Sequence, residues 1–265
     1  MFNIGKYQCI SKIGEGANSN VYSAQSQKTL EPLVLKIPKK AISFDNEKKI
    51  LSTFHHNGIV KLIDSFQENS KQILVLEYGK DLFDYIMEIG RLTEKDAKNL
   101  FRPIFEAVLY LHTNEIIHRD IKLENIIITE KQGLKLIDFD LSYEIKSTNS
   151  INKNNISNKK NITPSESCGT FQYIAPEILK CLNYGKEVDI WALGITLYAA
   201  IAGMFPFESE DQYSYTFEVL TKNPSFEFDD LTVSDNFKDL IEKMLNKDPS
   251  KRITISECLN HPWFG

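Results

Sequence analysis

His118-Arg119-Asp120-Ile121-Lys122-Leu123-Glu124-Asn125 and Asp138-Phe139-Asp140 are two short charged segments in the middle of this chain. Between them lie two apolar runs, Ile126–Thr129 and Leu134–Ile137, which flank the turn-forming residues Glu130-Lys131-Gln132-Gly133. This pattern predicts a β-hairpin with one charged segment before it and the other directly after it.

Short apolar or alternating runs dominate the chain before these segments. They predict five strands, at Tyr7–Ile13, Val21–Ala24, Leu33–Ile37, Ile59–Phe66 and Ile73–Tyr78. One helix interrupts them. It is expected to begin near Asp45 and to carry Ile50, Leu51 and Phe54 on one face.

After Gly79 the apolar residues recur at helical spacing. Thr93, with Asp96 three residues further on, resembles a helix cap, and the helix is expected to continue through Pro103 with a local kink. Helical spacing returns from Val188 onward. Strands first and helices afterwards predict an α+β fold of two lobes.

The composition describes a globular protein without a cationic surface. The 265 residues are 42% hydrophobic and 25% charged, which excludes global disorder and allows a large core. The net charge of -5 argues against binding to nucleic acid or anionic membranes, so we expect neither as a partner. A mildly acidic protein suits basic partners better.

The cysteines and the N-terminus favour a reducing compartment. Cys9, Cys168, Cys181 and Cys258 are scattered, without the spacing of a zinc site or a disulfide framework. The first residues lack the pattern of a secretory signal. The apolar run from Ile190 to Phe207 is marginal for a membrane span and is better interpreted as a buried helix. We expect a cytoplasmic protein, with access to the nucleus left open.

A glycine-rich turn and a strand lysine precede the charged segments. Gly14 and Gly16 join two predicted strands and would let backbone amides approach a phosphate chain, although such a turn alone is weak support. Lys36 lies in a predicted strand, where a half-buried ammonium needs a carboxylate. Glu47 on the following helix can supply it. A lone strand lysine is usually a solvated edge residue.

Taken in order, these segments resemble the catalytic domain of protein kinases, with the pattern H-R-D-x-K-x-x-N followed by D-F-x. The resemblance spans essentially the whole chain. It includes Ala175-Pro176-Glu177, Asp189 and Arg252, and implies that Arg252 pairs with Glu177 while Asp189 ties a buried helix to the catalytic loop. These three are expected to be structural. The implied fold is the bilobal kinase fold, with a small, mainly antiparallel β N-lobe that carries one key helix and a larger, mainly helical C-lobe.

The resemblance implies the roles of the catalytic residues. Asp120 would orient the attacking hydroxyl and accept its proton, Lys122 would neutralise the γ-phosphate, and Asn125 and Asp138 would hold Mg²⁺. Lysine at position 122, together with Thr170 in the substrate loop, is typical of serine/threonine kinases. The expected reaction therefore transfers the γ-phosphate of ATP to serine or threonine of protein substrates.

The resemblance also implies an ATP site. Lys36, held by Glu47, would orient the α- and β-phosphates, and Leu76 would lie beside the adenine. The hinge would run from Glu77 to Gly79. The expected cofactor-binding residues are Ile13, Gly14, Gly16, Val21, Val34, Lys36, Glu47, Leu76, Glu77, Gly79 and Ile127.

The domain boundaries follow from the same resemblance. Residues 1–265 would form one kinase domain, with residues 1–79 as N-lobe and hinge and 80–265 as C-lobe. The ending His261-Pro262-Trp263-Phe264 and the segment Trp191-Ala192-Leu193-Gly194 look like the calmodulin-dependent and AMP-activated kinase group. We expect a monomer. No calmodulin-binding segment follows the last helix, so the chain is either a minimal protein or a fragment.

Three features depart from the family pattern. Val34 replaces an alanine and should tighten the adenine pocket, and Asp140 replaces a glycine and should restrict the backbone flip that inactivates some kinases. The activation segment, 138–177, is lengthened by an asparagine-rich stretch, interpreted as a mobile loop that is either a tolerated insertion or a docking element.

Two other functions fit parts of the pattern. A pseudokinase scaffold would normally lack Lys36, Asp120, Asn125 or Asp138, all of which are present. A kinase of small molecules would normally lack the segment Ala175-Pro176-Glu177. Assays with a basic protein and with a panel of sugars and amines would separate the latter from a protein kinase.

Two acidic residues predict a preference for basic substrates. Glu124 resembles the catalytic-loop glutamate, and Asp81 the acid after the hinge, that kinases of this group use to hold a basic side chain. The alternative is that both are ordinary surface acids. We expect arginine or lysine a few residues before the phosphorylated serine or threonine.

The last expectation concerns regulation. In related kinases a regulatory threonine lies two residues before the cysteine of the segment Cys168-Gly169-Thr170, and here Glu166 holds that place. Its carboxylate could pair with Arg119 and give partial activity without phosphorylation, although one carboxylate carries less charge than a phosphate. The alternative is phosphorylation of Thr163, Ser165 or Ser167.

The measurement compares phosphatase-treated wild type with Glu166→Ala. Treated wild type should keep partial activity, and the variant should lose it. Silencing of the wild type by phosphatase, or full activity of Glu166→Ala, would show that Glu166 is not the switch.

Overall fold

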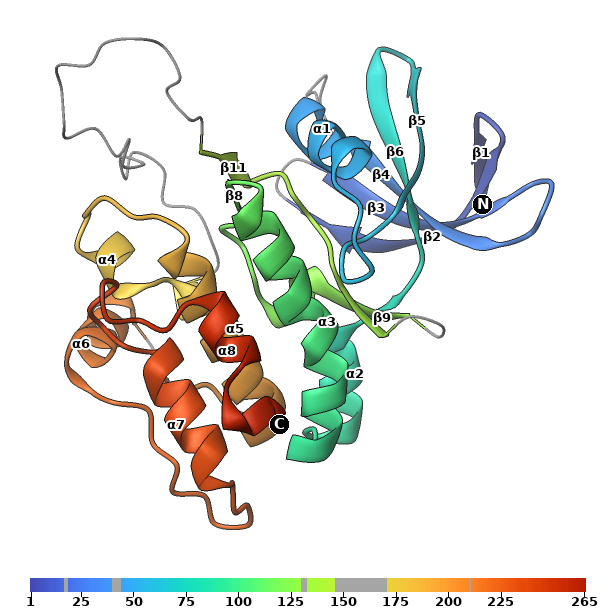
Figure 1. The fold of residues 1–265 in the computed structure, drawn as a ribbon. Coiled ribbons are helices and arrows are strands. Elements are labelled where there is room, and N and C mark those ends of the chain that lie inside the picture. Colours follow the sequence, from blue (N-terminus) through green and yellow to red (C-terminus); the bar gives the residue numbers. More distant parts are fainter. Residues whose placement is uncertain (17–18, 40–43, 130–132, 146–170, 210) are drawn as a thin grey trace, which may run out of the picture.

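An antiparallel six-stranded sheet forms the N-terminal part of the molecule (Figure 1). The computed structural model describes residues 1–16, 19–39, 44–129, 133–145, 171–209 and 211–265. The strands pair in the order β1-β2-β3-β4-β6-β5. Their bounds are Phe2–Ile4 (β1), Tyr7–Glu15 (β2), Ser19–Ser26 (β3), Pro32–Pro38 (β4), Leu62–Glu68 (β5) and Lys71–Glu77 (β6).

Alternation along β6 shows how the sheet is buried on both faces. Ile73 and Val75 belong to a small cluster with residues of β2, β3 and β4, whereas Leu74 and Leu76 belong to the main core of the molecule. Successive side chains of a strand point to opposite faces, so one apolar run serves two cores.

The fourth predicted strand begins later than expected. Ile59–Phe66 was predicted, but β5 starts at Leu62, because the preceding residues contact Leu136 in the predicted hairpin of residues 126–137. Ile59 forms a parallel bridge with Leu136, and the backbone N–H of Val60 donates to the carbonyl of Leu136 at 2.9 Å. The apolar residues at 59 and 60 thus join the two parts of the molecule.

Helix α1 (Asp45–Thr53) is the only helix between the strands of the sheet in the described part of the chain, and it lies beside the sheet (Figure 1). Glu47, Ile50 and Leu51 are its buried residues. Ile50 and Leu51 lie on the helix face that was predicted to be apolar. The buried Glu47 carboxylate requires a cation as its partner.

Helix α2 (Leu82–Ile89) had no counterpart in the sequence prediction. It starts directly after the hinge because Asp81 caps it: the carboxylate accepts the backbone N–H of Phe83 at 2.8 Å and of Asp84 at 3.3 Å. Aspartate is among the preferred residues at this position.

The C-terminal part is mainly helical, as predicted. Helix α3 (Glu94–Thr113) is capped by the Thr93 hydroxyl and includes Pro103. Helix α5 (Glu187–Ala202) is buried from Val188 to Ala202, which explains its apolar character on all sides. The remaining helices are α4 (Pro176–Leu179), α6 (Gln212–Thr221), α7 (Asp235–Met244) and α8 (Ile255–Leu259). With the sheet, they form the two-lobed α+β arrangement that was predicted.

The described helices do not include a membrane-spanning one. In the residues that the structure describes, no helix combines the length and the hydropathy needed to cross a bilayer. The run from Ile190 to Phe207 is instead buried in the helical lobe up to Ala202, with Trp191 and Phe207 stacked at 5.9 Å, whereas Met204 is exposed.

The predicted hairpin consists of β9 (Ile126–Thr129) and β10 (Gly133–Leu136), and β7 (Lys80–Asp81) pairs with β9. The short strands β8 (Ile116–Ile117) and β11 (Tyr143–Glu144) pair nearby. A 3₁₀ turn, η1 (Leu123–Asn125), leads into β9. The two charged segments therefore lie at the ends of one hairpin, next to the hinge.

Candidate active site

A cavity of about 480 Å³ is lined by residues of β2, β3, β4, β6, the hinge and β9. All the residues that were predicted to bind ATP or metal line it: Ile13, Gly14, Gly16, Val21, Val34, Lys36, Glu47, Leu76, Glu77, Gly79, Asn125, Ile127 and Asp138. Residues separated by more than a hundred positions along the chain thus share one surface.

The hinge passes very close to the hairpin. A Cβ atom placed on Gly79 would lie 2.8 Å from Cδ1 of Ile127, so only glycine allows this approach. Val34 pairs with Leu76 across β4 and β6, and the two side chains line the cavity with Ile127. These residues form the apolar end of the cavity.

Glu77 has a structural partner that the sequence did not predict. Its Oε1 accepts hydrogen bonds from the backbone N–H of Lys61 at 2.6 Å and from Nζ of the buried Lys135 at 2.8 Å. Lys135 belongs to β10, so this ion pair joins the last strand of the N-terminal sheet to the hairpin.

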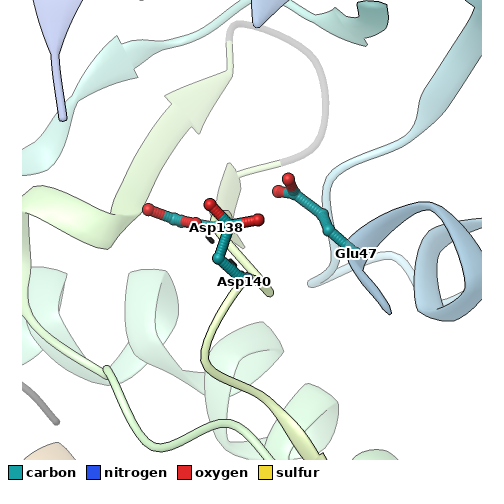
Figure 2. Close-up of side chains that lie close together, drawn as sticks. All are labelled: Glu47, Asp138 and Asp140. Atoms are coloured by element: carbon teal, nitrogen blue, oxygen red, sulfur yellow. Dashed lines mark hydrogen bonds between the residues drawn. The ribbon is translucent and has the colours of Figure 1, made fainter. Parts of the chain in front are cut away.

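Lys36 lies among three carboxylates at the polar end of the cavity. Its Nζ donates to Glu47 Oε2 at 2.7 Å, to Asp138 Oδ1 at 2.9 Å and to Asp140 Oδ2 at 3.0 Å. Figure 2 shows the three acidic side chains gathered around one point, Glu47 from α1 and the other two from the segment after β10. The contact with Glu47 was predicted and is confirmed, whereas the contact with Asp140 was not foreseen.

Burial and charge act in opposite directions on these groups. Burial alone would lower the pKa of Lys36, but the neighbouring carboxylates, Glu47 first, raise the pKa above its ordinary value. Complete burial raises the pKa of Glu47, against the attraction of Lys36. For Asp138, burial would raise the pKa, but the Lys36 ammonium lowers it below its ordinary value. Lys36 and Asp138 are therefore ionised at neutral pH.

Asp120, Lys122 and Asn125 form one hydrogen-bonded group. Asp120 Oδ2 accepts from Nζ of Lys122 at 2.8 Å and from Nδ2 of Asn125 at 2.6 Å. The Asn125 amide also donates to the Asp120 carbonyl at 2.8 Å. Two donors thus hold the carboxylate in place, as a positioned acid or base requires.

Asp189 of α5 anchors this segment, as expected. Its carboxylate accepts the backbone N–H groups of His118 and Arg119, both at 2.9 Å, and lies 2.9 Å from His112 Nε2. Arg119 has φ of 67° and Asp138 of 62°, in the left-handed region that non-glycine residues seldom adopt. Such strained residues often mark functional sites.

Helix α1 is also fastened to the segment that carries Asp138. The backbone N–H of Phe139 donates to Glu47 Oε1 at 3.3 Å, and Asn46 Nδ2 donates to the carbonyls of Phe139 and Ser142 at 3.3 and 2.9 Å. The Phe139 ring packs edge-on against His118, with ring centres 4.7 Å apart. These contacts place Glu47 beside Lys36.

The predicted pair of Arg252 and Glu177 is present. The guanidinium binds the carboxylate through two hydrogen bonds, of 2.7 and 2.8 Å, and NH1 also donates to the Glu187 carbonyl. The guanidinium lies over the Trp191 ring at 5.2 Å. This ion pair is remote from the cavity lining and holds the helical lobe together.

Some expectations fall outside the described residues. Thr170, Glu166 and the asparagine-rich stretch belong to residues 146–170, which the structure does not describe. Conversely, the cavity lining includes residues that were not predicted to bind the nucleotide: Glu15, Ser19, Val60, Lys80, Asp84 and Ile137. Val60 reaches the cavity through its backbone contact with β10.

Comparison with known proteins agrees with this geometry. The family described as "Protein kinase domain" matches residues 7–264. The chain is 37% identical over 273 residues to calcium/calmodulin-dependent protein kinase type 1B of Rattus norvegicus, covering 98% of this chain and 75% of the relative. It is 34% identical over 275 residues to the type 1 kinase of Caenorhabditis elegans (98% and 74%).

A third relative is much longer. The chain is 35% identical over 269 residues to the probable serine/threonine-protein kinase pXi of Dictyostelium discoideum. The match covers 98% of this chain but 36% of that protein. The similarity to all three relatives therefore concerns one domain of about this length.

Proposed function

Because this chain belongs to the protein kinase family and is a serine/threonine protein kinase, we propose that it transfers the γ-phosphate of Mg-ATP with the residues of the cavity described above. The observation that carries this proposal is the joint position of Lys36, Glu47 and Asp138 at one cavity, beside the group of Asp120 and Asn125. No observation favours a scaffold without turnover.

The cavity suits a nucleotide and a hard cation. Its volume of about 480 Å³ lies within the usual range for small-molecule sites, and one end is apolar while the other is charged. The Asp138 carboxylate and the Asn125 amide would supply oxygen ligands of the kind that Mg²⁺ prefers. When bound, Mg²⁺ supplies positive charge that neutralises the phosphate oxygens.

Side chains of the cavity would take the remaining roles in nucleotide binding and phosphate transfer. Lys36 would bind phosphate oxygens, and Glu47 would fix the direction of its ammonium. Asp120 would accept a hydrogen bond from the substrate hydroxyl and take its proton as the hydroxyl oxygen bonds to the γ-phosphorus. The bond from the γ-phosphorus to the bridging oxygen breaks in the same step, and ADP leaves. Lys122, already 2.8 Å from Asp120, would face the transferred phosphate. The apolar side chains of Val34 and Ile127 would enclose the adenine.

The direct test uses the purified chain with Mg-ATP and a general basic protein, followed by identification of the phosphorylated residues. Phosphoserine and phosphothreonine are expected. Transfer to a sugar or amine in place of protein, or nucleotide binding without transfer to any acceptor, would contradict the proposal.

We further propose a preference for basic residues before the phosphorylated residue, and of the two acids the structure favours Glu124. Asp81 is committed to the cap of α2, and burial raises its pKa to about 6. Asp81 would therefore lose its charge as the pH falls through about 6. Both acids line the cavity, but Glu124 accepts one hydrogen bond, from the Tyr173 hydroxyl at 3.2 Å, and caps no helix.

We expect Glu124→Gln to lower kcat/KM for peptides with an upstream arginine about tenfold, as the loss of a charge-assisted hydrogen bond would do. Peptides without the arginine should lose much less. The measurement is a peptide array at pH 7.5, where Asp81 is ionised. Tyr173→Phe is the control, because it removes the hydrogen bond between Tyr173 and Glu124 and keeps the Glu124 charge, so the preference for arginine should persist. Equal preference in wild type and Glu124→Gln would contradict the role.

The monomeric state, the cytoplasmic location and the lobe boundaries at residues 79 and 80 stay predictions.

A further inference from the structure

Asp140 adds a carboxylate to the neighbourhood of Lys36. Its Oδ2 lies 3.0 Å from Lys36 Nζ, and one carboxylate oxygen each of Asp140, Glu47 and Asp138 lie within 4.8 Å of one another. The residue is not among those with positive φ, so an aspartate is accommodated there without backbone strain. Figure 2 shows its side chain beside that of Asp138.

The ammonium of Lys36 has three N–H donors, and three carboxylates accept from it. Every donor therefore has an acceptor before any phosphate is present. A phosphate oxygen that binds Lys36 must take the place of one of these carboxylates. Because one hydrogen bond replaces another, the new bond contributes less to the free energy of phosphate binding.

The contacts indicate which carboxylate leaves. Glu47 is fully buried and also accepts the N–H of Phe139, so it is held on two sides. Asp138 Oδ1 also accepts the backbone N–H of Asp140 at 3.4 Å. The side chains of Asp138 and Asp140 are 39% and 30% exposed, so exposure does not distinguish them. Among the described residues, however, the Asp140 carboxylate has Lys36 as its one hydrogen-bond partner. Asp140 can therefore turn to solvent at the least cost.

Charge acts in the same direction as geometry. Three carboxylates against one ammonium give this part of the cavity a surplus of negative charge, which disfavours an anionic ligand. Removing Asp140 would lower that surplus and leave Lys36 its contacts with Glu47 and Asp138.

We propose that Asp140 competes with the nucleotide phosphates for Lys36, so that it weakens ATP binding without contacting the adenine. This inference rests on the proposed function of the cavity. Asp140 is then a residue that sets the ATP concentration at which this enzyme works, and it acts through Lys36.

The test measures binding by calorimetry for wild type, Asp140→Asn and Asp140→Ala, with Mg-ADP and with adenosine. We expect both variants to bind Mg-ADP about three- to tenfold more tightly, as a partly exposed ionic contact would imply. Adenosine should bind all three proteins equally, because it carries no phosphate for Lys36. Glu144→Gln is the matched control: it removes a carboxylate from the same segment, one that pairs with Lys49.

In kinetic assays, the Asp140 variants should show a lower KM for ATP, and kcat should change less than KM. Unchanged Mg-ADP binding, or tighter binding of adenosine by the same factor, would overturn the competition. A wild-type protein that binds neither adenosine nor Mg-ADP would instead overturn the proposed function itself, and the inference with it. Thermal unfolding of Asp140→Asn, which is close to aspartate in size, verifies that the fold is retained.

Discussion

Asparagine in place of Asp138 is expected to lower the rate of phosphate transfer by a factor of about a hundred or more. The change keeps the shape of the side chain but removes the charge that faces Lys36 at 2.9 Å and that would hold Mg²⁺. Lys36 keeps Glu47 as a partner, so the fold should be retained. The measurement is kcat and KM with a peptide substrate, together with thermal unfolding. Full turnover by the purified variant would refute the role of Asp138.

Asp120→Asn and Lys36→Met should cause losses of similar size. Asp120→Asn removes the proton acceptor, whereas Lys36→Met removes the cation on the phosphates. Lys36→Met also leaves Glu47 buried without its ammonium. Because burial already raises the pKa of Glu47, this carboxyl can become neutral and the protein can remain folded. The double variant Lys36→Met/Glu47→Gln is the control: it should be equally inactive but at least as stable as Lys36→Met.

Breaking the ion pair of Arg252 and Glu177 is expected to have the largest effect on stability. Arg252→Met should lower the free energy of unfolding by about 3 to 5 kcal/mol, because it leaves a buried, uncompensated carboxylate. The two side chains are 0% and 2% exposed. Urea unfolding at pH 7.5 measures the change.

Two further variants serve as controls for this prediction. Lys186→Met breaks an ion pair with Glu115 whose side chains are 30% and 52% exposed, and it should cost less than about 1 kcal/mol. Arg252→Met/Glu177→Leu removes both buried charges and should recover part of the loss. If Arg252→Met costs no more than Lys186→Met, the ion pair does not hold the helical lobe together.

Local pattern predicted most of the fold, and its errors have physical causes. The strands and long helices follow from apolar periodicity, as in α5, where burial on all sides gives an apolar run. Helix α2 was missed because it is short and only Lys80 and Asp81 separate it from the hinge. The start of β5 was misplaced because Ile59 and Val60 are apolar for another reason, their contact with β10.

The chemistry of the candidate site was readable because phosphate transfer demands particular residue types in a particular order. Asp120, Asn125 and Asp138 could be assigned roles without coordinates, since few side chains can hold Mg²⁺ or accept a proton. Glu47 could be assigned to Lys36 because a buried ammonium needs a partner and the next helix offers one.

The sequence alone therefore determined the family, the division into a strand-rich first part and a helical second part, and the kinds of chemical group at the site, because these depend on residue identity and periodicity. Only the tertiary structure decided which groups share a partner. Asp140 reaches Lys36 across 104 positions of the chain, and Asp81 and Glu124 both line the cavity although Asp81 alone caps α2. Such contacts depend on the direction in which each side chain leaves the folded backbone, and neither spacing nor residue type specifies that direction.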